Sequence, residues 1–152
     1  MSPFASCNKS DFKVRPLKFT DLSIVYQLLV ELSPFKPDSE SYRAVYEKVS
    51  RQENAAFLCA VDSEKVVGFA SIFYLTRVRG GDLGLIEDVI VDGAYRRHGI
   101  GRMLLDALLA EAERKGVSKI ILESSDMARP FYQSFGFELE GSLMKKILGR
   151  TS

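Results

Sequence analysis

A strand-like run, a turn carrying glycines and arginines, and a long amphipathic run follow one another between residues 83 and 116. The first run, LGLIEDVIV, is rich in β-branched residues and predicts a strand. From Ile100 to Lys115 apolar residues recur with the helical period, and Gly116 follows as the expected C-cap. The next run, SKIILES, predicts a further strand. A strand, a crossover helix and a strand in this order predict a sheet covered by helices.

The rest of the chain extends this pattern on both sides. FKVRPL predicts a first strand, and two helices follow: DLSIVYQLLVEL, which starts at Thr20 or Asp21, and DSESYRAVYEKVS, capped by Asp38 or Ser39. AAFLCAV, VVGFASIFYL and LGLIEDVIV predict three antiparallel strands joined by tight turns. MARPFYQSF predicts a short helix, and FELEGSLMKKIL predicts a last strand. The expected fold is α/β (α+β), a single domain over residues 1–152 with a mixed, mostly antiparallel sheet in the order β-α-α-β-β-β-α-β-α-β.

Charge and composition exclude several classes of function. The 21 Lys and Arg balance 20 Asp and Glu, so no overall field attracts the chain to nucleic acid or to an anionic membrane. No segment approaches the about 20 apolar residues that span a bilayer, and the first residues lack the apolar core of a signal peptide. We therefore expect a cytoplasmic protein. Cys7 and Cys59 lack zinc-site spacing, so we expect no metal, and Cys59, inside AAFLCAV, is predicted to be a buried thiol.

The turn DGAYRRHGIG at the start of the central helix is suited to bind an anion. A helix N-terminus presents unpaired N–H groups and the positive end of the macrodipole. Gly99 and Gly101 leave those amides uncovered, and Arg96, Arg97 and Arg102 add positive charge. This pattern indicates a pyrophosphate site, although a glycine turn with solvated arginines would have the same spacing.

Two other phosphate loops are excluded by their spacing. G-x-x-x-x-G-K-[ST] is absent, and G-x-G-x-x-G fails because Leu104 stands where the third glycine belongs.

Two segments carry a resemblance to a known family. RRHGIG resembles the R/Q-x-x-G-x-G/A loop of the GNAT superfamily of acetyl-CoA-dependent N-acetyltransferases, and ARPFYQSFGF resembles its A-x-x-F-Y-x-x-x-G-F segment. The resemblance implies the GNAT fold over nearly the whole chain. It also implies two contacts with acetyl-CoA: loop amides on the pyrophosphate, from Arg97, His98, Gly99, Ile100, Gly101 and Arg102, and strand backbone on the pantetheine arm, from Val89, Ile90 and Val91.

Within that superfamily, LIEDVIVDGAYRRHGIG and SKIILES look most like the glucosamine 6-phosphate N-acetyltransferases, which act in amino-sugar nucleotide (UDP-GlcNAc) synthesis. Acetyl transfer to an amine needs a neutral nucleophile, stabilisation of an oxyanion and a proton for the departing thiolate. Tyr132 matches the family tyrosine that meets the sulfur and can donate that proton; otherwise it is an aromatic residue of the core. His98, the single histidine, lies in the loop and is not expected to be catalytic.

Glu87 and Asp88 interrupt the apolar strand LGLIEDVIV. Consecutive strand residues face opposite sides, so we expect the two carboxylates to have different tasks, or to form surface salt bridges. The resemblance places both at the substrate site, with the Glu123 carbonyl as a further acceptor for the amine. It also implies a homodimer in which Lys119 reaches the sugar phosphate held by the neighbouring subunit.

Further residues have weaker matches to substrate-binding positions. Ser33 stands in the place of a substrate-contacting threonine, and Arg77 and Arg79 precede the glutamate strand. Ile147 departs from the family pattern, because arginine is expected there. This departure weakens the match to the glucosamine 6-phosphate enzymes but not the match to acetyltransferases. Two alternatives stay open: a GNAT enzyme for another amine, such as a polyamine, an aminoglycoside or a protein N-terminus, or a coenzyme A-binding module without catalysis.

Overall fold

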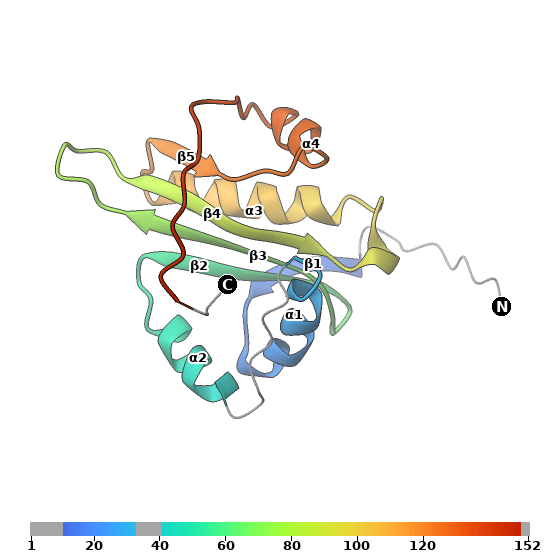
Figure 1. The fold of residues 1–152 in the computed structure, drawn as a ribbon. Coiled ribbons are helices and arrows are strands. Elements are labelled where there is room, and N and C mark those ends of the chain that lie inside the picture. Colours follow the sequence, from blue (N-terminus) through green and yellow to red (C-terminus); the bar gives the residue numbers. More distant parts are fainter. Residues whose placement is uncertain (1–10, 33–40, 150–152) are drawn as a thin grey trace.

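The computed structural model describes residues 11–32 and 41–149 and contains one five-stranded sheet (Figure 1). The strands lie in sequence order: β1 (Phe12–Pro16), β2 (Ala55–Asp62), β3 (Lys65–Leu75), β4 (Leu83–Val91) and β5 (Lys119–Leu122). Neighbours from β1 to β4 are antiparallel, and β5 is parallel to β4. The helices are α1 (Leu22–Leu29), α2 (Ser41–Ser50), α3 (Ile100–Arg114) and α4 (Arg129–Gln133). The predicted mixed, mostly antiparallel sheet with flanking helices is confirmed.

Each face of the sheet carries its own apolar core. The apolar stripe of α3 is fully buried against one face, where it contacts Ala70 and Ile72. Val25 and Leu28 of α1 pack on the opposite face, against residues that include Phe69 and Ile90. Gly116, with a φ of 72°, follows α3 as predicted. The helix that crosses from β4 to β5 is therefore fixed along its whole length.

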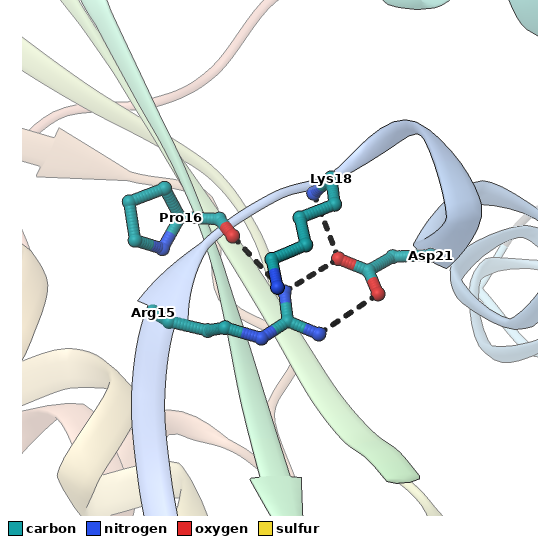
Figure 2. Close-up of polar contacts among 4 residues, drawn as sticks. All are labelled: Arg15, Pro16, Lys18 and Asp21. Atoms are coloured by element: carbon teal, nitrogen blue, oxygen red, sulfur yellow. Dashed lines mark hydrogen bonds and ion pairs between the residues drawn. The ribbon is translucent and has the colours of Figure 1, made fainter. Parts of the chain in front are cut away.

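The junction between β1 and α1 is held by a buried carboxylate (Figure 2). Asp21 is 5% exposed and accepts hydrogen bonds from Arg15 Nη1 (2.7 Å), Arg15 Nη2 (3.0 Å) and the Lys18 amide (2.7 Å). Burial alone raises the pKa of Asp21, but these donors outweigh it and leave the pKa below its usual value. Cys59 is fully buried, as predicted, and burial raises its pKa to about 12, so this thiol is unreactive.

A β-bulge changes the direction of the side chains in the middle of β4. Asp88 pairs with Ser71 and Ile86 pairs with Ile72, so Glu87 is an extra residue without a partner on β3. Ile86 and Val89 both pack in the core on the α3 side. Glu87 and Asp88 therefore both lie on the opposite face, which contradicts our expectation that the two carboxylates face opposite sides.

The predicted last strand is wrong. Between Phe137 and Gly149 the described chain forms no strand, and Figure 1 draws this segment without an arrow. A strand needs a partner edge, and β5, the edge strand on this side, is only four residues long. The apolar residues of the segment are consequently exposed, Met144 to 93%.

Candidate active site

A cavity of about 670 Å³ opens where the carboxyl end of β4 meets the N-terminus of α3. Its walls come from β4, from the loop before α3 and from the segment that leads into α4. The residues that line it are Val89, Val91, Tyr95, Arg96, Arg97, Gly99, Ile100, Gly101, Arg102, Ser125, Met127, Ala128, Phe131 and Tyr132. The structure thus brings together most of the predicted cofactor residues and the predicted tyrosine.

The loop before α3 has the geometry of an anion site. Arg97 and Gly99 have φ angles of 70° and 79°, in the left-handed region. Gly99 is the N-cap of α3, and Ile100, 1% exposed, anchors the first turn in the core. The first amides of a helix have no partner within it, so those of the Ile100–Arg102 turn can bind a ligand. A side chain at Gly101 would begin 3.5 Å from the Phe131 ring, between the amides and α4.

The free edge of β4 forms a second wall. Pairing with β5 ends at Ile86 and Leu122, whereas β4 continues to Val91. On its other edge β4 still pairs with β3, through Val89 and Val91. The edge toward α4 therefore carries backbone groups that can bind an extended chain as an added strand would. Ile90 can contribute only its backbone, because its side chain is buried on the α1 face.

The basic residues of the loop have different surroundings. Arg96 and Arg97 line the cavity, and Arg96 Nη2 lies 3.3 Å from Glu31 of the turn after α1. Arg102 donates to Ser134 Oγ (3.0 Å) and stacks over the Phe135 ring (4.8 Å). Its guanidinium therefore ties the start of α3 to the end of α4 as well as lining the cavity.

His98 does not line the cavity. Its ring lies 6.3 Å from the ring of Phe12 on β1. Any contact of His98 with the cofactor would therefore be made by its backbone amide, and this contact stays a prediction.

Tyr132 stands between two cavities. It lines the cavity beside α3, which we name the cofactor cavity after its predicted ligand, and a second one of about 290 Å³, which is formed by β5, α4 and the segment after Gly136. The rings of Phe131 and Phe137 lie 5.1 and 6.0 Å from its ring and hold it in place. Burial raises the pKa of Tyr132, so the phenol is protonated at neutral pH and has a proton to give.

The two carboxylates of β4 differ in exposure. Glu87 is exposed, whereas Asp88 is half-buried. Burial raises the pKa of Asp88, the neighbouring Glu87 charge raises it further, and the Ser71 hydroxyl lowers it. Glu123 directly follows β5, at the point where β5 and β4 separate. The predicted amine-binding groups thus lie next to the point where β4 and β5 separate, but Glu87, Asp88 and Glu123 do not line the cavity beside α3.

The predicted phosphate ligands lie elsewhere in the chain. Lys119 pairs with Leu83, at the opposite end of β4 from the cofactor loop, and its Nζ lies 3.4 Å from Glu140 Oε2. Arg77 is in the β3–β4 hairpin and donates to the Gly81 carbonyl at 2.8 Å; Figure 1 shows this hairpin far from the loop before α3. Arg79 belongs to the same hairpin, and Ser33 lies outside the described residues. Lys119 and Arg77 thus lie toward the end of β4 that is far from Val91, although Lys119 lines the smaller cavity together with Tyr132.

Sequence reasoning missed the segment before α4. Ser125 and Met127 line the cofactor cavity, and Ser125 Oγ accepts from the Ala128 amide at 3.2 Å. A serine shortly before a proline-containing turn is a typical start of a helix, so SSDMARP carried this information. In the described parts of the chain, no group of acidic, cysteine and histidine residues could hold a metal ion, and no helix is long and apolar enough to cross a bilayer.

Comparisons with known proteins agree with this geometry. The model of the acetyltransferase (GNAT) family matches residues 22–137. A glucosamine 6-phosphate N-acetyltransferase of Trypanosoma brucei brucei is 34% identical over 139 residues, which cover 89% of this chain and 95% of that protein. Glucosamine 6-phosphate N-acetyltransferase 1 of Oryza sativa subsp. japonica is 31% identical, with 83% and 81% covered. The crystal structure of a Trypanosoma brucei acetyltransferase superposes with a TM-score of 0.81 at 32% identity, and covers 91% of this chain and 100% of that one.

Proposed function

Since the chain belongs to the GNAT acetyltransferase family, we propose that it transfers the acetyl group of acetyl-CoA to the amine of glucosamine 6-phosphate. The observation that carries the proposal is the cavity between the N-terminus of α3 and the free edge of β4, in a chain similar over most of its length to enzymes of that activity.

The residues of the cavity fit coenzyme A. A pyrophosphate needs several N–H donors and positive charge, and the turn after Gly99 offers both, with Arg97 beside it. The pantetheine arm is an extended chain with amide groups, which suits the unpaired edge of Val89 to Val91. Bound acetyl-CoA supplies an activated acetyl thioester, and the chain's own residues have the remaining tasks.

Three side chains carry the proposed chemistry. Asp88 and Glu87 accept hydrogen bonds from the amino group of the sugar, orient it, and take its proton toward water. The Tyr132 phenol donates a hydrogen bond to the departing sulfur and then gives up its proton. Reaction by direct attack of the neutral amine requires no covalent intermediate with the protein.

The sugar phosphate and the subunit arrangement belong together in this proposal. Lys119 and Arg77 lie at the far end of β4 from Val91, and the proposal gives Lys119 the sugar phosphate of a site that is shared with a second chain. The exposed apolar residues after Gly136, among them Leu143 and Met144, give such a partner a surface to cover. We therefore propose a homodimer; the cytoplasmic location stays a prediction from the sequence.

The activity is tested by following thiol release from acetyl-CoA with a panel of amines. We expect turnover with glucosamine 6-phosphate and little or none with glucosamine, polyamines or peptides. Faster thiol release with a polyamine or a peptide than with the sugar phosphate would contradict the proposal and favour another GNAT substrate class.

A further inference from the structure

Ser71 is a buried hydroxyl without a hydrogen bond of ordinary geometry. The residue is 1% exposed, and among the described residues its Oγ makes no hydrogen bond of ordinary geometry, although the hydroxyl acts on the Asp88 carboxyl and lowers its pKa. A buried hydroxyl that lacks a partner destabilises a fold, and alanine at this position of β3 would avoid that cost. We therefore expect the hydroxyl to have a role in function rather than in the stability of the strand.

The register of the sheet places Ser71 opposite Asp88. The two residues pair directly in the β3–β4 ladder, next to the bulge at Glu87. Directly paired residues of antiparallel strands share a face and have Cβ atoms about 5 Å apart. A rotation about the serine Cα–Cβ bond can therefore bring Oγ into hydrogen-bond distance of the Asp88 carboxylate.

The surroundings of Asp88 give that contact a purpose. The titratable groups on the elements around it are Glu87 beside it, Tyr26 on α1, Lys65 and Tyr74 on β3, Lys119 on β5 and Glu123 after β5. Of these, Glu87 acts on Asp88, and its negative charge together with burial favours the protonated, neutral acid. A protonated Asp88 could not accept the proton of an ammonium group, so a donor that stabilises the anion would assist the reaction.

We infer that Ser71 is a positioning residue, whose hydroxyl donates to the Asp88 carboxylate and holds it ionised and oriented toward the acceptor amine. This inference rests on the proposed function, because it assigns Ser71 a part in the same reaction. Ser71 itself does not touch the substrate, since its side chain is enclosed in the sheet. No bond is made or broken at the serine.

The test compares Ser71→Ala with Ser50→Ala, in which an exposed hydroxyl that donates only to the Glu47 carbonyl is lost. We expect Ser71→Ala to lower kcat/KM roughly tenfold and to move the acid limb of its pH profile upward by about one unit, the loss of one hydrogen bond to a charged group. Its melting temperature is expected to fall by no more than a few degrees, because one hydrogen bond to a half-buried carboxylate is lost while the pairing of the strands is unchanged. Ser50→Ala is expected to match the parent enzyme in both kinetic measurements.

A second measurement does not depend on turnover. The pKa of Asp88 is measured by NMR, from the chemical shift of its carboxyl carbon as a function of pH, in the parent and in Ser71→Ala. The resonance is assigned as the one that is missing from the spectrum of Asp88→Asn. A higher midpoint in Ser71→Ala supports the pairing even if glucosamine 6-phosphate proves not to be the substrate. An unchanged midpoint overturns the inference, as does an unchanged pH profile of kcat/KM in an enzyme that acetylates the sugar phosphate. In the Asp88→Asn background, Ser71→Ala should have no further effect on the residual rate; a further tenfold loss would show that Ser71 acts elsewhere.

Discussion

Replacement of Asp21 by asparagine tests the junction between β1 and α1. The change keeps the size of the side chain but removes the charge that accepts two hydrogen bonds from Arg15 and one from the Lys18 amide (Figure 2). Removing one partner of a buried ion pair destabilises a protein by about 3 to 5 kcal/mol. Because the Arg15 side chain is 26% exposed and can be hydrated after the change, we expect about 2 to 3 kcal/mol.

This loss corresponds to a fall in melting temperature of roughly 4 to 12 °C for a chain of this size. The difference also depends on pH. Asp21 has a pKa below its unfolded value, so its contribution is complete above the unfolded pKa and is lost as the pH falls through the folded one. The melting temperatures of the parent and the variant should therefore approach each other in acid.

Thermal unfolding followed by circular dichroism, at about pH 7 and again in acid, measures both effects. Asp106→Asn is the matched control, because it makes the same chemical change at an exposed position of α3. Equal melting temperatures for the parent and Asp21→Asn at neutral pH would refute the reasoning. So would a difference of the same size at both pH values, since it would not come from the ionised carboxylate.

The remaining predictions concern the site. Gly101→Val puts a branched side chain between the amides and the Phe131 ring, so coenzyme A affinity by calorimetry should fall at least about tenfold while the fold persists; unchanged affinity would remove the loop from the site. Tyr132→Phe removes only the hydroxyl and should lower kcat on the order of 10²-fold, with KM changing less; parental turnover, limited by chemistry, would contradict the role of general acid. Lys119→Ala should raise the KM for glucosamine 6-phosphate about ten- to a hundredfold, and mixing it with Tyr132→Phe chains should restore some activity in a shared site. A monomer in sedimentation experiments that is fully active at the same concentration would contradict the shared site.

Sequence alone predicted the parts of the fold that depend on local pattern. The period of α3, its stop at Gly116 and the meander from β2 to β4 each follow from residues near in the chain. The cofactor cavity was predictable for the same reason, since its loop and its strand are adjacent segments, 83–91 and 92–102.

The arrangement of the two carboxylates was not predictable in this way. Strict alternation puts Glu87 and Asp88 on opposite faces, and a bulge arises only from the register between two strands. The sequence of β4 alone does not determine that register, because the register also depends on β3, where Ser71 pairs with Asp88. The role inferred for Ser71 could not have been found from the sequence for the same reason.

The wrong strand prediction after Gly136 has a different physical cause and bears on the homodimer. A pattern of apolar residues indicates which side chains need cover, but it does not say which backbone will pair with the segment. In the single chain, the described segment has no ladder and leaves Leu143 and Met144 exposed to 67% and 93%. If a second chain supplies the missing cover, Leu143→Asp should weaken dimerisation by at least about tenfold in sedimentation equilibrium, since a buried leucine contributes about 1.5 to 3 kcal/mol. The same association would bring Lys119 to the partner's site, so the variant should also raise the KM for glucosamine 6-phosphate. An unchanged association constant would show that the segment after Gly136 is not part of the dimer interface.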